Sequence, residues 1–518
     1  NMVDVLFVTP NNSKGVYQSL SNSLSAIETP TWSLLLAESC RSIGLKVRIL
    51  DTNAENLSDK ESFLRIKKAN PRLICFVVYG QNVNAGTTNM SGATRLTNYI
   101  KMKKMLTPIC FIGSHVQALP SKTVINEKNI DFVFTNEGVY SLRNILKLEK
   151  INKENIKKVN GICYLLDGKP FFTPPEKVVP NERMDIDLPG YAWDLLPYNQ
   201  RPFDLYRSPL WHAEYDEEKR TPYAALQTSL GCQFGCNFCM INIINRTDND
   251  EIGVASNYSK MRFWSTKFII KEFDKLIKYG IKTIRIVDEM FMLNPKYYIP
   301  LCEELAKRND NDELRLWAYS RVDTIKKLET LKLVRKAGIK WLCLGIESAN
   351  KSVRLEVSKG KFEDIDIKKV VEKIHESDID IMANYIFGLP GDDMNRMKET
   401  FNLSVELNTL GWNAYAAMAL PGSELYKHAI EMKYPLPSSY EGYSFHSYST
   451  LPLPTKYLKP SEILEFRDQC FNKYHLNKTF LSKIEKKFGN KAVKNITDST
   501  RLKLKRKIIE EDQKNNEI

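Results

Sequence analysis

Short apolar runs alternate with amphipathic segments through the middle of the chain. After a first strand-like run at residues 221–230, five further apolar runs each follow a segment with helical periodicity. These runs are residues 281–287, 314–319, 341–345, 379–386 and 412–419. Alternation at this spacing predicts parallel strands with crossover helices. We therefore expect a partial (β/α)6 barrel over residues 221–422.

The N-terminal residues 2–150 show the same alternation. Strands are predicted at residues 3–8, 46–50, 73–79, 108–112 and 132–134. Helical patterns at residues 30–43 and 91–104 lie between them. The order predicts a doubly wound, Rossmann-like α/β domain whose ligand site lies at the carboxyl ends of its strands. Because no Gly-x-Gly-x-x-Gly segment follows the first strand, a dinucleotide is not the expected ligand.

Two stretches lack the alternation. Residues 151–220 are rich in proline and predict an irregular connector between the two α/β units. Residues 423–518 predict a mainly helical C-terminal region, with a helix over 459–474.

The composition narrows the class of protein. The chain has 518 residues, of which 43% are apolar and 26% charged, as in folded multidomain proteins. No apolar run approaches the roughly 18 residues that a membrane helix needs, and no signal peptide is expected, so we expect a cytoplasmic protein. The net charge of +13 is spread thinly outside a basic C-terminal tail, which disfavours nucleic acid as the partner.

Three of the ten cysteines are clustered. Residues 231–239 read Gly-Cys-Gln-Phe-Gly-Cys-Asn-Phe-Cys, so Cys232, Cys236 and Cys239 can turn toward one point. A fourth cysteine would complete a structural zinc site, but none is near in sequence. Three cysteines on a [4Fe–4S] cluster leave one iron open to a substrate or cofactor. A zinc knuckle with an unrecognised fourth ligand remains the alternative.

The cysteine cluster and the segments after it resemble the radical S-adenosylmethionine (SAM) enzymes. In that superfamily a first barrel strand leads into Cys-x3-Cys-x2-Cys, with an aromatic residue before the last cysteine, here Phe238. The matching segments after later strands are Asp288-Glu289, Ser320-Arg321, Gly345-Ile346-Glu347-Ser348 and Gly388-Leu389-Pro390-Gly391. The resemblance implies a [4Fe–4S] cluster on the three cysteines and SAM contacts from Phe238, Glu289, Ser320, Arg321, Glu347, Asn384 and Leu389.

Three of the implied SAM contacts have a chemical reason, and two of these have an ordinary alternative. A carboxylate at Glu289 suits the SAM ammonium, and an acidic helix cap is its alternative. The planar fork of Arg321 suits a carboxylate, and a surface ion pair is its alternative. Glu347 can accept hydrogen bonds from ribose hydroxyls.

The N-terminal unit resembles the cobalamin-binding domain fused to a large branch of these enzymes. The resemblance places cobalamin contacts in three loops, at Gly80, Gln81, Asn82, Gly113, Ser114, His115, Thr135, Asn136 and Glu137. The Asp-x-His-x-x-Gly signature of other cobalamin proteins is absent, so no protein histidine is expected below the cobalt. For His115, a loop histidine that bonds to the backbone is the favoured alternative to a cobalamin contact.

The resemblance implies a cobalamin-dependent radical SAM methyltransferase. Such an enzyme moves a methyl group from SAM, through methylcobalamin, to an unactivated carbon with the help of a 5′-deoxyadenosyl radical. It also implies a small-molecule or natural-product substrate and an electron donor such as flavodoxin or ferredoxin. Three alternatives stay open: cyclisation or rearrangement without methyl transfer, a non-catalytic cobalamin or iron–sulfur sensor, and modification of nucleic acid.

Overall fold

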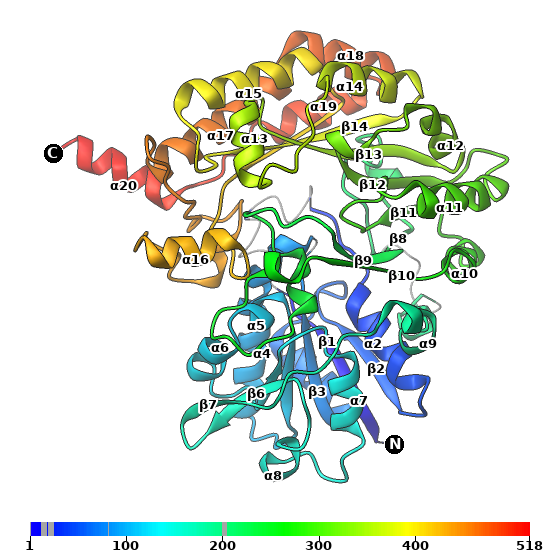
Figure 1. Cartoon of the computed structure of the whole chain (residues 1–518), viewed down its shortest axis with the longest axis vertical. Coiled ribbons are helices and arrows are strands. Elements are labelled where there is room, and N and C mark those ends of the chain that lie inside the picture. The colour runs from blue at the N-terminus through cyan, green and yellow to red at the C-terminus, as the bar shows by residue number, and fades with distance from the viewer. Residues whose placement is uncertain (1, 12–17, 19–24, 81, 199–204) are drawn as a thin grey trace.

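The computed structural model describes residues 2–11, 18, 25–80, 82–198 and 205–518. Two α/β units are stacked, and two C-terminal helices, within residues 478–499, lie on the side of the second unit away from the first (Figure 1). None of the helices in these ranges is long and apolar enough to cross a membrane.

The N-terminal unit is built on a seven-stranded sheet with the order β2-β1-β3-β4-β5-β6-β7. Its five parallel strands are β1 Val3–Thr9, β2 Val47–Asp51, β3 Pro71–Val78, β4 Ile109–Gly113 and β5 Phe132–Phe134. The strand order reverses between β1 and β3, which is where doubly wound sheets bind ligands. The predicted doubly wound fold is confirmed.

Helices cover both faces of this sheet. They are α2 Thr31–Arg41, α3 Asp59–Ala69, α4 Met90–Met102, α5 Ser114–Ala118, α6 Pro120–Asn126, α7 Val139–Leu146 and α8 Lys153–Ile156. Alternate residues of β1 enter opposite cores: Phe7 packs with the α2 side chains, and Leu6 packs with those of α3 and α4. Because both faces are covered, the central residues Val5–Val8 of β1 are all apolar.

The prediction of an irregular connector over residues 151–220 is wrong for its first part. β6 Ile162–Leu166 and β7 Lys169–Phe172 form a hairpin that extends the N-terminal sheet antiparallel to β5. Asp167 and Gly168 make the turn with positive φ angles of 51° and 77°. An Asp-Gly pair between two apolar runs is a hairpin signal that the sequence does contain. The short helix α9 Met184–Asp187 follows.

The second unit is a six-stranded parallel sheet. Its order is β8 Tyr223–Leu226, β11 Thr283–Ile286, β12 Arg315–Arg321, β13 Ile339–Glu347, β14 Asp380–Phe387 and β15 Gly411–Ala416. The crossover helices are α10 Thr266–Lys278, α11 Pro295–Lys307, α12 Leu331–Lys336, α13 Lys351–Val357, α14 Ile367–Glu376 and α15 Met394–Leu407. β8 and β15 are the two ends of the sheet order, so the predicted partial barrel is confirmed.

The predicted first strand, residues 221–230, is divided in two. β8 is followed by β9 Ser229–Cys232, which pairs antiparallel with β10 Lys260–Phe263 outside the barrel sheet. The Asp288 carboxylate causes the break, because it accepts hydrogen bonds from Thr228 N and Oγ1 and from Ser229 Oγ, each at 2.6 Å. The cysteine loop therefore leaves from a two-stranded ribbon beside the barrel.

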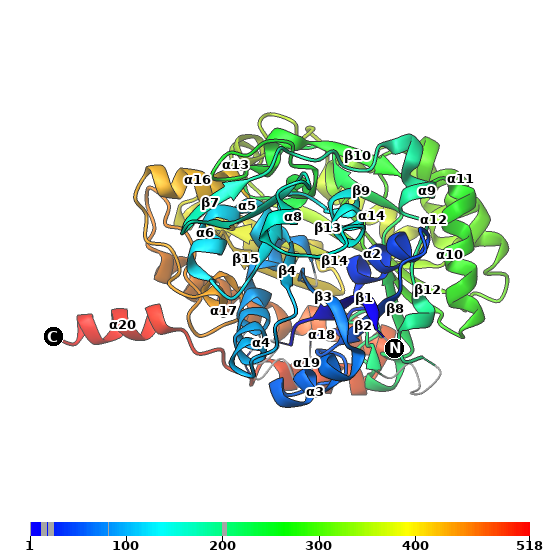
Figure 2. The same cartoon turned by 90° about the horizontal axis from the view of Figure 1, so that it is seen from below.

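The C-terminal region is helical, as predicted. It contains α16 Glu424–Glu431, α17 Pro460–His475, α18 Lys478–Phe488, α19 Asn490–Ser499 and α20 Lys507–Asn516. α17 covers β15, where Tyr474 stacks on Trp412 with ring centroids 5.5 Å apart. α20 projects from the rest of the molecule in two perpendicular views (Figure 1, Figure 2).

The two units are joined beside the open edge of the barrel. The hydroxyl of Thr29, in the loop after β1, donates to Ala225 O at 2.9 Å and accepts from Ala225 N at 3.0 Å. Its neighbour Glu28 pairs with Arg285 of β11 at 2.9 Å. The N-terminal unit thus covers part of the edge strand β8 and faces the barrel interior.

Candidate active site

The cysteine loop begins where β9 ends. Gly231 is needed there, because it has a φ of 84° and a Cβ at this position would lie 2.0 Å from Lys260 O. Phe234 N donates to Cys232 Sγ at 3.5 Å, and Arg321 Nη1 lies 3.6 Å from Cys236 Sγ. Both donors favour thiolate over thiol.

Burial opposes ionisation of all three thiols unless a cation is bound. Burial raises the pKa of Cys232 to about 12 and that of Cys236 to about 11, and it raises the pKa of Cys239 well above the ordinary value. Bound iron would supply the positive charge that offsets this cost. Within the part of the chain that the structure describes, no three His, Cys, Asp or Glu side chains converge on a single metal ion. The cysteines of a [4Fe–4S] cluster each bind a different iron, so this donor set fits a cluster without such convergence.

A cavity of about 350 Å³ lies at the carboxyl ends of the barrel strands. Four predicted SAM contacts line it: Phe238, Glu289, Glu347 and Asn384. Burial raises the pKa of Glu289 to about 7, against the opposing effect of Arg285, and burial also raises the pKa of Glu347 to about 7. Buried carboxyl groups with such pKa values in a cavity are typical of functional sites.

Glu347 is held in an unusual backbone conformation. Its φ is 67°, in the left-handed region, and the register between β13 and β14 shifts between Gly345 and Glu347. Strain of this kind in a residue other than glycine persists where the surroundings impose it, often at binding sites. The bulge places this carboxylate on the cavity wall.

The other three predicted SAM contacts lie behind the wall. Ser320 Oγ accepts from Met292 N at 3.0 Å and so holds the segment after Glu289. Leu389 is fully buried in an apolar cluster against which Phe238 packs. Both side chains support the cavity without lining it.

Arg321 faces the cysteine loop. It pairs with Asp323 at 2.5 Å, and its guanidinium lies between the rings of Phe234 and Phe362, 4.3 and 4.5 Å from their centroids. Since Asp323 supplies the carboxylate for its fork, Arg321 is placed to steady the cysteine loop. A clamp on the SAM carboxylate stays a prediction.

A second cavity, of about 370 Å³, lies at the carboxyl ends of β1, β2 and β3. Both cavities share wall residues, among them Glu28, Asn82, Thr88 and Arg285, so they adjoin. Among the described residues, none is a hydrogen-bond partner for three polar atoms on the second cavity's wall: Thr9 Oγ1, Ser33 Oγ and Gln227 Oε1. Buried polar groups of this kind are normally satisfied, so they indicate a polar ligand.

The predicted cobalamin contacts divide between this cavity and the protein interior. Gly80 and Asn82 line the cavity, and Gln81 lies outside the described residues. Gly113, Ser114 and His115 are not among the wall residues of either cavity. The His115 ring bonds through Nδ1 to Thr87 Oγ1 at 3.0 Å. Gly113 is required for packing, because a Cβ there would lie 2.1 Å from Val78 O.

The third predicted loop, Thr135–Glu137, joins the two units. Thr135 is buried and donates its backbone N–H to Gly161 O at 3.0 Å. Glu137 pairs with Arg262 of β10 at 2.5 Å and accepts from Val179 N at 2.8 Å. Asn136 donates to Glu176 O at 2.8 Å. These partners give the loop a structural role, and its contact with cobalamin stays a prediction.

Several residues that line the first cavity were not among the predicted site residues. The walls of the first cavity also include Glu28, Trp211, Arg285, Trp317, Tyr415 and Phe445. Arg285 had a detectable signal, since it is the one charged residue within the apolar run Thr283–Val287. Its guanidinium lies 4.6 Å from the ring centroid of Trp317. The aromatic residues come from distant segments, so no local motif indicates them.

Residues 226–404 match the model of the radical SAM superfamily. This part of the chain is a radical SAM domain. The matched range contains the three cysteines, the two cavity carboxylates and most of the barrel.

Two curated relatives extend the similarity beyond the radical SAM domain. An uncharacterised methyltransferase of Pyrococcus horikoshii is 26% identical over 387 residues, covering 74% of this chain and 75% of the relative. An anaerobic magnesium-protoporphyrin IX monomethyl ester cyclase of Cereibacter sphaeroides is 21% identical over 425 residues, covering 79% of this chain and 61% of the cyclase.

Two solved structures share the fold. The radical SAM methyltransferase TsrM from Kitasatospora setae, with cobalamin and a [4Fe–4S] cluster bound, has a TM-score of 0.61 and 17% identity over 83% of this chain and 78% of TsrM. The cobalamin-dependent radical enzyme OxsB, with aqua-cobalamin and SAM bound, has a TM-score of 0.65 and 15% identity over 94% of this chain and 70% of OxsB. At these identities the similarity shows a shared fold, and it covers most of this chain.

Proposed function

We propose that this protein is a cobalamin-dependent radical SAM methyltransferase that acts on an unactivated carbon of a small molecule. The observation that carries the proposal is the pair of adjoining cavities, one at the carboxyl ends of the barrel strands and one at those of the N-terminal sheet. A [4Fe–4S] cluster, SAM and cobalamin would supply the radical and the methyl group. Methyl transfer requires these groups close together, and two facing strand ends provide that.

Residues of the first cavity would bind and orient SAM. Glu289 would accept hydrogen bonds from the ammonium, and Glu347 from ribose hydroxyls. Phe238 lines the same wall directly before Cys239, so it brings SAM and the cysteine loop together. The aromatic wall of Trp211, Trp317 and Tyr415 would exclude water.

Residues of the second cavity would hold cobalamin. The loop residues Gly80 and Asn82 line it, and the unpaired oxygens of Ser33 and Gln227 can accept hydrogen bonds there. Ser33 is fully buried and Gln227 is 7% exposed, so water cannot freely satisfy them. This donor set fits a large polar cofactor.

Cyclisation or rearrangement without methyl transfer is the second candidate. It is supported by the relative named as a cyclase, which is 21% identical over 79% of this chain. The two candidates differ in how SAM is used. We also propose a reduced flavodoxin or ferredoxin as the electron donor.

The proposed function predicts specific products from the reconstituted enzyme. Chain loaded with iron, sulfide and hydroxocobalamin, and reduced with titanium(III) citrate, should convert SAM both to S-adenosylhomocysteine and to 5′-deoxyadenosine. Mass spectrometry counts both products. Formation of 5′-deoxyadenosine without S-adenosylhomocysteine would favour the cyclase-type reaction, and failure to retain cobalamin would remove both candidates.

SAM binding should strengthen as the pH rises from 5.5 to 7.5. A carboxyl group whose pKa is about 7 is mostly protonated at pH 6, and the SAM ammonium favours its ionised form. If one proton is released, the dissociation constant falls by up to about tenfold per pH unit below the pKa. Titration calorimetry on the cluster-loaded enzyme measures the dissociation constant of SAM at each pH. The chosen pH values lie below the range in which an α-amino group titrates. Glu289→Gln should reduce the dependence to the part that Glu347 causes, and a pH-independent wild type would contradict the assignment.

Bound cobalamin should have no protein imidazole on its cobalt. The described wall of the second cavity includes no histidine, and the buried His115 is already bonded to Thr87. In the Co(II) state, the electron paramagnetic resonance spectrum should therefore lack superhyperfine splitting from a coordinated nitrogen. A spectrum with that splitting would contradict both the histidine-free and the base-off prediction.

A further inference from the structure

One segment of the C-terminal region forms part of the first cavity's wall. Residues 440–451, here named the wall loop, contribute Tyr443, Ser444, Phe445 and His446 to it. The Phe445 ring lies against Tyr415 of β15, with centroids 4.4 Å apart. Apart from one short turn at Tyr440–Tyr443, the wall loop has no regular secondary structure, so its position depends on its anchors.

The first end of the wall loop is anchored on the N-terminal unit. Tyr440 OH donates to Glu127 at 2.7 Å, and the Tyr440 ring packs edge-on against His115 at 5.3 Å. Glu441 accepts a hydrogen bond from Ser91 in α4. This end of the wall loop is therefore held in place by the N-terminal unit.

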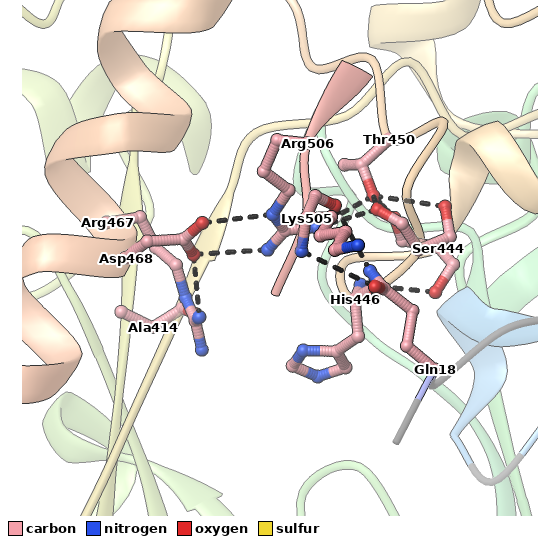
Figure 3. A network of polar contacts seen from close by, with 10 residues as sticks. Gln18, Ala414, Ser444, His446, Thr450, Arg467, Asp468, Lys505 and Arg506 are labelled. Atoms are coloured by element: carbon pink, nitrogen blue, oxygen red, sulfur yellow. Dashed lines mark hydrogen bonds and ion pairs between the residues drawn. The ribbon is translucent and has the colours of Figure 1, made fainter. Parts of the chain in front are cut away.

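The second end is held by a residue near the C-terminus. Arg506 Nη1 donates to Ser447 O and to Thr450 Oγ1, each at 3.0 Å. Arg506 Nε and Nη2 donate to the two oxygens of Asp468 in α17 at 2.9 and 3.1 Å (Figure 3). Arg506 is only 3% exposed. A buried guanidinium with four donated hydrogen bonds fixes the geometry between two segments.

The same network reaches the barrel. Asp468 also accepts from Arg467 Nη1 at 3.0 Å, and Arg467 Nε donates to Ala414 O of β15 at 2.8 Å. Ala414, Arg467, Asp468 and Arg506 thus form a continuous connection from a barrel strand to the wall loop, and the His446 ring points away from this network (Figure 3). The loop is thereby aligned with the strand end on which Tyr415 lies.

Neighbouring contacts show that the arm bearing Arg506 lies along the wall loop. Lys507 N donates to Tyr448 O at 2.9 Å, and Tyr448 OH donates to Glu510 at 2.7 Å. Gln18 Nε2 donates to His446 O at 2.7 Å and to Lys505 O at 3.2 Å. The basic tail therefore contacts the wall loop directly.

We propose that the wall loop closes the substrate end of the first cavity and that Arg506 is the positioning residue that holds it closed. The proposal rests on the proposed function, since it assigns the substrate to this cavity. Without the guanidinium, Ser447 O loses a donor and Asp468 keeps only Arg467. Solvent-sized molecules then gain access to the site where SAM is cleaved.

The holoenzyme with Arg506→Gln tests the position of the loop. Hydrogen–deuterium exchange of amides in residues 440–451 should be at least tenfold faster than in the wild type, with the barrel strands unchanged. Arg501→Gln is the matched control, because Arg501 belongs to the same tail and its side chain is 80% exposed. Thr450→Val and Asp468→Asn each remove a single contact of the same network. They replace Arg506→Gln in this experiment if that variant does not fold.

Deuterium incorporation into 5′-deoxyadenosine measures access to the cavity. In the titanium(III)-reduced holoenzyme, one electron cleaves SAM to methionine and a 5′-deoxyadenosyl radical, which can take deuterium from perdeuterated glycerol to give monodeuterated 5′-deoxyadenosine and a glycerol radical. The deuterated fraction should rise several-fold in Arg506→Gln and in Phe445→Ala, but not in Arg501→Gln. A general loss of stability would lower total turnover without raising this fraction.

Two results would overturn the inference: exchange in residues 440–451 equal to that of Arg501→Gln, or an unchanged deuterated fraction in Arg506→Gln. If the wild type forms no 5′-deoxyadenosine, the proposed function fails instead, and hydrogen exchange alone still decides the role of Arg506.

Discussion

Replacing Cys232, Cys236 and Cys239 together by alanine is expected to remove the iron–sulfur cluster and to abolish SAM cleavage. The three thiols lie on one loop where loss of solvent raises their pKa values, so a bound cation would favour their ionisation. Iron and sulfide content, the brown absorbance and 5′-deoxyadenosine formation measure the loss.

Cys302→Ala is the matched control for this triple variant. Cys302 is a free, fully buried cysteine in α11, and it should keep the cluster. Because none of the three ligands remains in the triple variant, residual activity from partial ligation is not expected. Full iron and sulfide content in that variant would refute the assignment of the cluster to this loop.

Glu137→Ala is expected to destabilise the protein by about 3–5 kcal/mol, because it leaves a buried guanidinium without its partner. The side chains of Glu137 and Arg262 are 1% and 0% exposed, and their ion pair joins the loop after β5 to β10. Urea unfolding of the apoprotein, followed by tryptophan fluorescence, measures the change.

Two further variants test the origin of that loss. Lys326→Ala breaks an ion pair whose side chains are 63% and 54% exposed, so it should cost less than about 1 kcal/mol. Glu137→Leu combined with Arg262→Met replaces both charges by apolar groups and should recover most of the stability. If Glu137→Ala is as mild as Lys326→Ala but loses cobalamin, Glu137 is a cofactor contact after all.

The sequence by itself determined both α/β units and the cysteine site. Strand segments such as Leu73–Val78 of β3 and Ile109–Ile112 of β4 are entirely apolar because both faces of their sheet are covered, so periodicity separates them from the amphipathic helices between them. The Cys-x3-Cys-x2-Cys spacing is local in the chain. Placing Glu289 and Glu347 at strand ends also needed only the order of the elements, since parallel strands end on one face.

Only the tertiary structure decided what each polar side chain contacts. In the pair Asp288-Glu289, the first residue holds the turn into β9 and the second lines the cavity. Glu137 meets Arg262, 125 positions later, and Arg506 meets Asp468 and the wall loop. Hydrogen-bond partners are set by approach in space over a few ångström, whereas a strand or helix pattern is set by the neighbours of each residue in the chain. Local residues therefore predict where a cavity lies, and distant ones determine which side chains form its walls.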